Sequence, residues 1–124
     1  MKLQICTREE AENLAGWPNW AVIAMTPEVN LYPGWHAVHC VNPGNKIRHE
    51  HAFAIVNFVR CNVIRVNGFL IIGDRDIART QGVAAWLAEK CHVPQFALTR
   101  SDAEFALDPE FNQRVLEALR MADK

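Results

Sequence analysis

The chain has 124 residues, of which 50% are hydrophobic and 22% are charged. This composition excludes a disordered tail, a fibre and a two-domain enzyme with a cleft between lobes, and it predicts one globular domain over residues 1–124. Thirteen Lys and Arg residues against fourteen Asp and Glu residues leave no overall basic field, so we expect no nucleic-acid partner.

The first half of the sequence alternates strand-like and helix-like segments. In chain order, the pattern predicts a strand at 2–6, a helix to about Leu14, strands at 21–25 and 35–41, and a helix at 49–61. Thr7 and Glu10 form a capping box, which marks where the first helix begins. The apolar residues of 49–61 cover so much of the circumference that we expect that helix to be well buried.

The second half continues the alternation. Asn67-Gly68 favours a hairpin between 63–66 and 69–72, although Asn62 can equally end the preceding helix and leave 69–72 as the only strand. The run 69–72 has no polar alternation, which is typical of a strand buried on both faces of a parallel sheet. A helix from about Arg79 to Lys90 follows, then a capping box at 101–104 and a last helix beginning at 108–110.

Strands that alternate with helices predict an α/β fold with a central, mainly parallel sheet and helices on both faces. Ligands of such sheets bind beyond the carboxyl ends of the strands. Residues 36–100 carry eight basic and four acidic side chains, whereas both ends of the chain are net acidic. An anion site is therefore expected in this middle part, and the loop between the buried strand and the next helix offers backbone amides and a helix N-terminus for it.

At this loop the sequence resembles the cysteine-dependent protein tyrosine phosphatases, in particular the small dual-specificity-like proteins of bacteria and phages. Their signature, His-Cys-x-x-Gly-x-x-Arg-Ser/Thr, connects a buried strand to a helix, and the aligned stretch here is residues 72–80, IGDRDIART. Five further segments resemble the strands and helices of this family, in the same order along the chain: ICTREEAENL, WAVIAMT, HEHAFAIVNFVR, TQGVAAWLAE and DPEFNQRVLEAL. The resemblance covers almost the whole chain and implies a tyrosine-phosphatase-like fold.

The departures from the signature concern the residues that carry its chemistry. In the family, a thiolate attacks phosphorus, the loop amides and the Arg hold the phosphoryl oxygens, and an Asp from a preceding loop protonates the leaving group. Here the nucleophile position is Gly73, the signature Gly is Asp76, and the preceding loop at 41–48 has no Asp or Glu. Only Arg79 and Thr80 match.

These departures predict a pseudophosphatase, which binds without catalysing. The expected binding loop consists of Gly73, Asp74, Arg75, Asp76, Ile77, Ala78, Arg79 and Thr80. Its partner would be a phosphorylated or acidic protein, with phosphate or sulfate as simple ligands and no cofactor. A like charge about 5 Å from phosphate costs roughly 3 kcal/mol at an effective dielectric of 20, so Asp74 and Asp76 oppose binding, and Asp76 can instead pair with Arg79.

Two alternatives are a working hydrolase and an interaction module without an anion site. His39-Cys40 also follows a strand, which makes Cys40 an alternative nucleophile, but seven residues separate it from Arg48 where the signature has five. Asp74-Arg75-Asp76 resembles the D-x-D motif of haloacid-dehalogenase-like phosphatases, in which the first Asp is the nucleophile. The chain after residue 80 lacks that family's acidic pair for magnesium.

The remaining motifs favour structural roles. His49 and His51 begin a helix, where side chains two apart point away from each other, so we expect no metal site. Trp17, Trp20 and Trp35 are interpreted as core and loop anchors. The four cysteines are widely spaced, and the sequence lacks a signal peptide and an apolar run long enough to cross a bilayer. We therefore expect a cytoplasmic protein that does not bind membranes, with reduced, mostly buried cysteines.

Overall fold

A computed structural model of the chain describes residues 2–12, 19–25, 35–42, 44, 46–73, 80–92, 98–100 and 109–124. The strands are β1 (Lys2–Thr7), β2 (Trp20–Ala24), β3 (Trp35–Cys40), β4 (Gly68–Gly73) and β5 (Leu98–Arg100). The helices are α1 (Arg8–Glu12), α2 (His49–Asn62), α3 (Gln81–Lys90) and α4 (Pro109–Ala122). Within the described ranges, no helix is both long and apolar enough to span a membrane.

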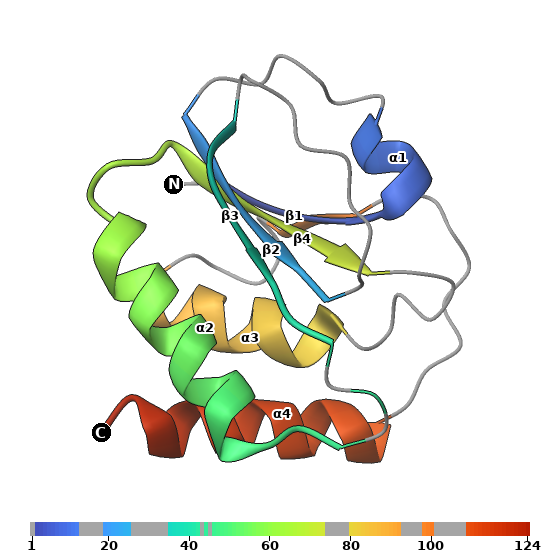
Figure 1. The fold of residues 1–124 in the computed structure, drawn as a ribbon, viewed down its shortest axis with the longest axis vertical. Helices are drawn as coiled ribbons and strands as arrows, with labels where there is room; N and C mark the ends of the chain where they lie inside the picture. Colours follow the sequence, from blue (N-terminus) through green and yellow to red (C-terminus); the bar gives the residue numbers. More distant parts are fainter. Residues whose placement is uncertain are drawn as a thin grey trace.

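The strands form one sheet in the order β3-β2-β4-β1-β5, and every neighbouring pair is parallel (Figure 1). This confirms the predicted α/β class with a parallel sheet. Each crossover between parallel strands requires a long connection, and α2 and α3 supply two of them. The three-residue strand β5, which pairs with β1 at one edge of the sheet, was not predicted.

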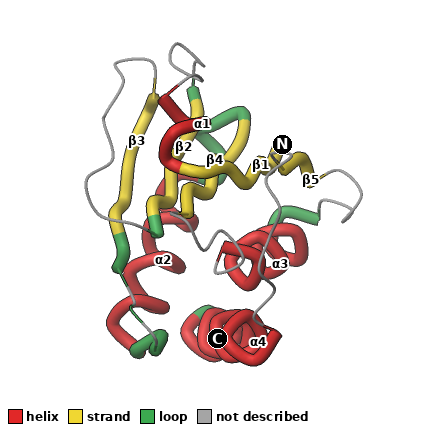
Figure 2. Tube along the Cα trace, turned by 90° about the vertical axis from the view of Figure 1, so that its right-hand side faces the viewer, coloured by secondary structure: helices red, strands yellow, loops and turns green. Residues whose placement is uncertain are grey.

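Helices cover both faces of the sheet, as the sequence indicated (Figures 1 and 2). On one face, Leu3, Ile5, Ala21, Ile23, Phe69 and Ile71 pack with the apolar residues of α2, α3 and α4. On the other face, Cys6, Val22, Ala24, Leu70 and Ile72 pack with Ala11 of α1. The strands therefore bury alternate residues on opposite faces, which explains why the run 69–72 shows no polar alternation.

β4 occupies the centre of the sheet, between β2 and β1, and all six of its residues are buried. The preceding residues 63–65 form a turn, so of the two readings for this segment the helix that ends at Asn62 is correct. The close approach of β1 explains the glycine at the start of β4. A Cβ on Gly68 would lie 2.5 Å from the main-chain oxygen of Lys2, so no larger residue fits without moving a strand.

One apolar side chain of α2 departs from the predicted burial. Ala52, Ile55, Val56 and Val59 are fully buried, but the side chain of Phe53 is 48% exposed and stacks on His49. Four of the five apolar side chains on which the prediction of a well-buried helix rested are therefore buried, and Phe53 is the exception.

The helix α4 lies against α2 and α3, on their side away from the sheet (Figure 2). Two side-chain contacts between α3 and α4 have the same sequence offset: Asn112 donates to Gln81, and Arg120 donates to Glu89. A constant offset means that the two helices run in the same direction. Their N-termini therefore lie together at the carboxyl edge of the sheet, and their C-termini lie at the opposite end (Figure 1).

Candidate anion site at the carboxyl edge of the sheet

The strand β4 ends at Gly73 in the middle of the carboxyl edge. Gly73 is in register with Thr7 of β1, and the amide of Met25, just after β2, donates to the carbonyl of Ile72 at 2.7 Å. The segment that leaves β4 therefore starts between two strands rather than at a sheet edge. This is the position at which parallel α/β sheets place their ligands.

Of the eight predicted loop residues, the structure describes the first and the last. Gly73 ends β4, and Thr80 is the fully buried N-cap residue of α3. Asp74, Arg75, Asp76, Ile77, Ala78 and Arg79 lie outside the described residues. The described ends agree with a six-residue connection from a central strand to a helix.

Contacts with α4 hold the start of α3 in place. The side chain of Asn112 donates to Gln81, the first residue of α3, at 3.1 Å. A Cβ on Gly82 would lie 2.6 Å from the main-chain oxygen of Asn112 and 2.8 Å from the Cβ of Val115, so the backbone of α3 lies directly against the backbone and a side chain of α4 here. The helix N-terminus, whose dipole favours anions, is thus fixed at the carboxyl edge.

The turn from β1 to α1 borders the same edge, and its predicted capping box is confirmed. The amide of Thr7 donates to the Glu10 carboxylate, and the amide of Glu10 donates to the Thr7 hydroxyl, each at 3.1 Å. Burial, with a smaller contribution from Glu10, raises the pKa of Cys6 to about 12. Cys6, which is in register with Ile72 next to the end of β4, is therefore a protonated thiol and not a nucleophile.

The expectation of mostly buried cysteines was wrong, because Cys40 and Cys61 are exposed and only Cys6 is fully buried. Cys40 ends the edge strand β3, and β2 separates it from β4, which corresponds to about 10 Å at the usual strand spacing. It is accessible, but it does not lie at the end of the central strand.

His39 and Cys40 do not form a catalytic pair, because successive strand residues point to opposite faces. The His39 ring stacks on Phe58 of α2 at 5.5 Å between centroids, and its buried Nε2 atom has no hydrogen-bond partner among the residues that the structure describes. Burial lowers the pKa of His39, so the neutral ring is favoured. A neutral, half-buried imidazole that faces α2 is poorly placed to activate a thiol on the other face.

The histidines at the start of α2 have separate structural contacts. The Nδ1 atom of His51 accepts from the amide of Arg48 at 3.1 Å and so caps the helix, while His49 stacks on Phe53. Within the described part of the chain, three or more His, Cys, Asp or Glu side chains do not gather in a way that would hold a metal ion.

The tryptophans that the structure describes are core residues. Trp20, at the start of β2, is 7% exposed, and Trp86 of α3 is 2% exposed. Trp17 lies outside the described residues, as does the side chain of Trp35.

Sequence reasoning missed a charged cluster at the far end of α3 and α4. Arg120 pairs with Glu89 through two hydrogen bonds, and Asp123 pairs with both Lys90 and Arg60. These partners are 31 to 63 residues apart in sequence, so only the packing of three helices brings them together. No local motif marks such a cluster.

Comparisons with protein-family models, with curated proteins and with solved structures found no match to this chain.

Proposed function

We propose that this protein is a catalytically impaired relative of the cysteine-dependent tyrosine phosphatases, and that it binds a phosphorylated or acidic protein at the loop 73–80. The observation that carries the proposal is the position of Gly73. It ends the buried central strand of a parallel sheet, where the phosphatase signature has its nucleophilic cysteine, and it has no side chain with which to attack phosphorus.

The surroundings of Gly73 support binding over catalysis. Cys6 on the neighbouring strand is buried and protonated, and Cys40 lies two strands away. The helix α3, by contrast, directs a ten-residue dipole toward the loop, and Arg79 and Arg75 add two basic side chains in sequence. Asp74 and Asp76 oppose them, so the expected affinity for a simple phosphate is weak, in the millimolar range.

Phosphate binding is tested by thermal unfolding with 0 to 20 mM phosphate at constant ionic strength. We expect the melting temperature to rise with phosphate in the parent protein and in Arg114→Ala, because Arg114 is exposed on α4, where its Nε atom donates to the carbonyl of Glu110 in the same helix. The rise should be absent in Arg79→Ala. An equal rise in all three proteins would show that phosphate acts elsewhere, and no rise in any would favour an interaction module without an anion site.

The alignment itself is tested by restoring the signature. The double substitution Gly73→Cys with Asp76→Gly should bind phosphate or vanadate at least tenfold more tightly than the parent, because it removes one acid and adds a thiolate that vanadate can trap. Asp76→Gly alone is the matched control for the charge. If the double variant binds vanadate no better than this control, residues 72–80 do not correspond to the phosphatase signature.

A hydrolase that uses Cys40 is the second candidate, because Cys40 is exposed at the carboxyl end of a strand. Turnover of a generic aryl phosphate separates the two readings. The binding proposal expects no turnover above background in the parent protein. Robust turnover that is lost in Cys40→Ala, or in Asp74→Asn, would instead establish a working phosphatase with another nucleophile.

A further inference from the structure

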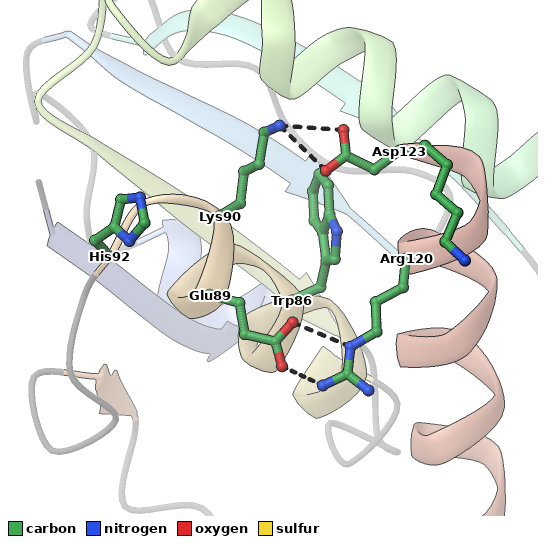
Figure 3. A pocket seen from close by; sticks show the side chains of 7 residues that line it. Trp86, Glu89, Lys90, His92, Arg120 and Asp123 are labelled. Atoms are coloured by element: carbon green, nitrogen blue, oxygen red, sulfur yellow. Dashed lines mark hydrogen bonds and ion pairs between the residues drawn. The ribbon is translucent and has the colours of Figure 1, made fainter.

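A pocket of about 390 Å³ lies between the last turns of α3 and α4, at the end of these helices opposite to the loop 73–80 (Figure 3). Its lining residues are Trp86, Glu89, Lys90, His92, Arg120, Asp123 and Lys124. Trp86 is 2% exposed and forms the apolar floor, while the charged side chains stand around it. The volume falls within the range of small-molecule sites.

Ion pairs across the pocket neutralise both of its carboxylates. The Glu89 carboxylate accepts two hydrogen bonds from the Arg120 guanidinium, and this contact lowers the pKa of Glu89. The Asp123 carboxylate receives Lys90 Nζ at 3.1 Å and Arg60 Nη2 at 2.8 Å. The single negative charge of Asp123 is therefore paired with two positive charges, which leaves a net positive charge beside the pocket.

Two further donors, His92 and Lys124, also line the pocket. In Figure 3, His92 stands to one side of Trp86. Neither donor side chain has a hydrogen bond or ion pair within the described part of the chain. His92 has a φ of 55°, a left-handed conformation in which glycine is more usual, and it follows the last turn of α3.

The geometry points to this pocket as a binding site for a small organic anion that carries carboxylate or phosphate groups. Lys124 and Lys90 supply the charge, the His92 imidazole supplies an N–H, and Trp86 supplies an apolar floor. The last carbonyls of α3 and α4 face this end of the helices and offset part of the surplus, so the affinity is modest and the dissociation constant is in the millimolar range. The site is independent of the loop 73–80, because the ten residues of α3 separate the two by about 15 Å.

Titration of the full chain with citrate, and separately with pyrophosphate, tests the site by two-dimensional amide NMR at low ionic strength. Saturable changes in amide chemical shift should be largest at His92, Asp123 and Lys124, and should not occur at Thr7 or Gly73. Saturable shifts confined to the carboxyl edge, or shifts that never saturate, would overturn the proposal. Because Arg79 belongs to the loop, Arg79→Ala should leave these shifts unchanged, which keeps a failure here distinct from a failure of phosphate binding at the loop.

Two substitutions of opposite expected effect separate ligand binding from a change in fold stability. Lys124→Gln removes a free cation and should weaken binding about threefold to tenfold, whereas Glu89→Gln removes an acid, releases Arg120 and should tighten binding by a similar factor. Arg114→Gln removes an exposed α4 cation outside the pocket and should change nothing. Weaker binding in both Lys124→Gln and Glu89→Gln, or equal binding in all the proteins, would refute the assignment.

Discussion

The contact between α3 and α4 at Gly82 predicts a stability cost for the smallest possible enlargement, Gly82→Ala. The added Cβ would lie 2.6 Å from the main-chain oxygen of Asn112 and 2.8 Å from the Cβ of Val115, where ordinary contact begins at 3.4 Å. The helices must therefore separate locally by about 0.8 Å. Because the nearest atom belongs to the backbone, truncating Val115 cannot remove the clash.

The magnitude follows from two opposing effects. Overpacking a close contact costs about 1–3 kcal/mol, and replacing a helical glycine by alanine returns about 1 kcal/mol. A backbone oxygen cannot rotate aside as a side chain can, so we take the overpacking cost from the upper part of its range, about 2–3 kcal/mol, and expect a net loss of about 1–2 kcal/mol in the free energy of unfolding. For a chain of this length the melting temperature should fall by roughly 4–8 °C.

The assay is urea unfolding followed by far-ultraviolet circular dichroism. Ala85→Gly is the matched control, because this partly exposed α3 position loses only helix propensity, about 1 kcal/mol. If Gly82→Ala is as stable as the parent or more stable, the close α3–α4 contact is refuted. The gain in helix propensity would then not be offset by a steric clash with α4.

Three further predictions concern side chains outside that contact. Cys40 and Cys61 are exposed, whereas Cys6 is buried with a pKa of about 12. A thiol reagent at pH 7.5 should therefore modify Cys40 and Cys61 within minutes, and Cys6 only when the protein unfolds. If mass spectrometry finds Cys6 among the rapidly modified residues, its burial is contradicted. Burial lowers the pKa of His39 in the folded protein, so the unfolded chain takes up a proton on this residue at a higher pH than the folded protein does. The free energy of unfolding should therefore fall as the pH drops through about 6.5, and His39→Phe should reduce this fall. An unchanged slope of unfolding free energy against pH in His39→Phe would assign the pH dependence to other groups. Asp123→Asn breaks two partly exposed ion pairs and should cost about 0.5–1 kcal/mol at low salt; a cost that persists undiminished in 1 M NaCl would mean that charge is not its origin.

Local patterns explain why much of the fold was predictable. The capping box of Thr7 and Glu10, the continuous apolar run of β4 and the Pro109 start of α4 each act within a few residues, and each lies where the sequence indicated. Two local signals competed near Asn62, a helix end at this residue and a hairpin at Asn67-Gly68, and the structure shows the helix end.

Features that depend on distant partners were not predictable. The strand β5 has only three residues and exists through its pairing with β1, which no local pattern marks. Cys40 looked like a buried strand end, but its strand lies at the edge of the sheet, and strand order is a property of the whole chain. Of the candidate loop, which the sequence marked through its likeness to a signature, the structure describes only the flanks Gly73 and Thr80, at a strand end and a helix start.

Different chemistry holds the two ends of α3, and this determines how each end can respond to a ligand. At the loop end, a backbone contact at Gly82 and one hydrogen bond from Asn112 leave little freedom for the helix start. At the other end, exposed ion pairs such as Glu89 with Arg120 join the helices, and a competing anion or added salt can exchange their partners. An anion at the loop must therefore fit a fixed helix start, whereas an anion at the charged end can rearrange its own binding groups.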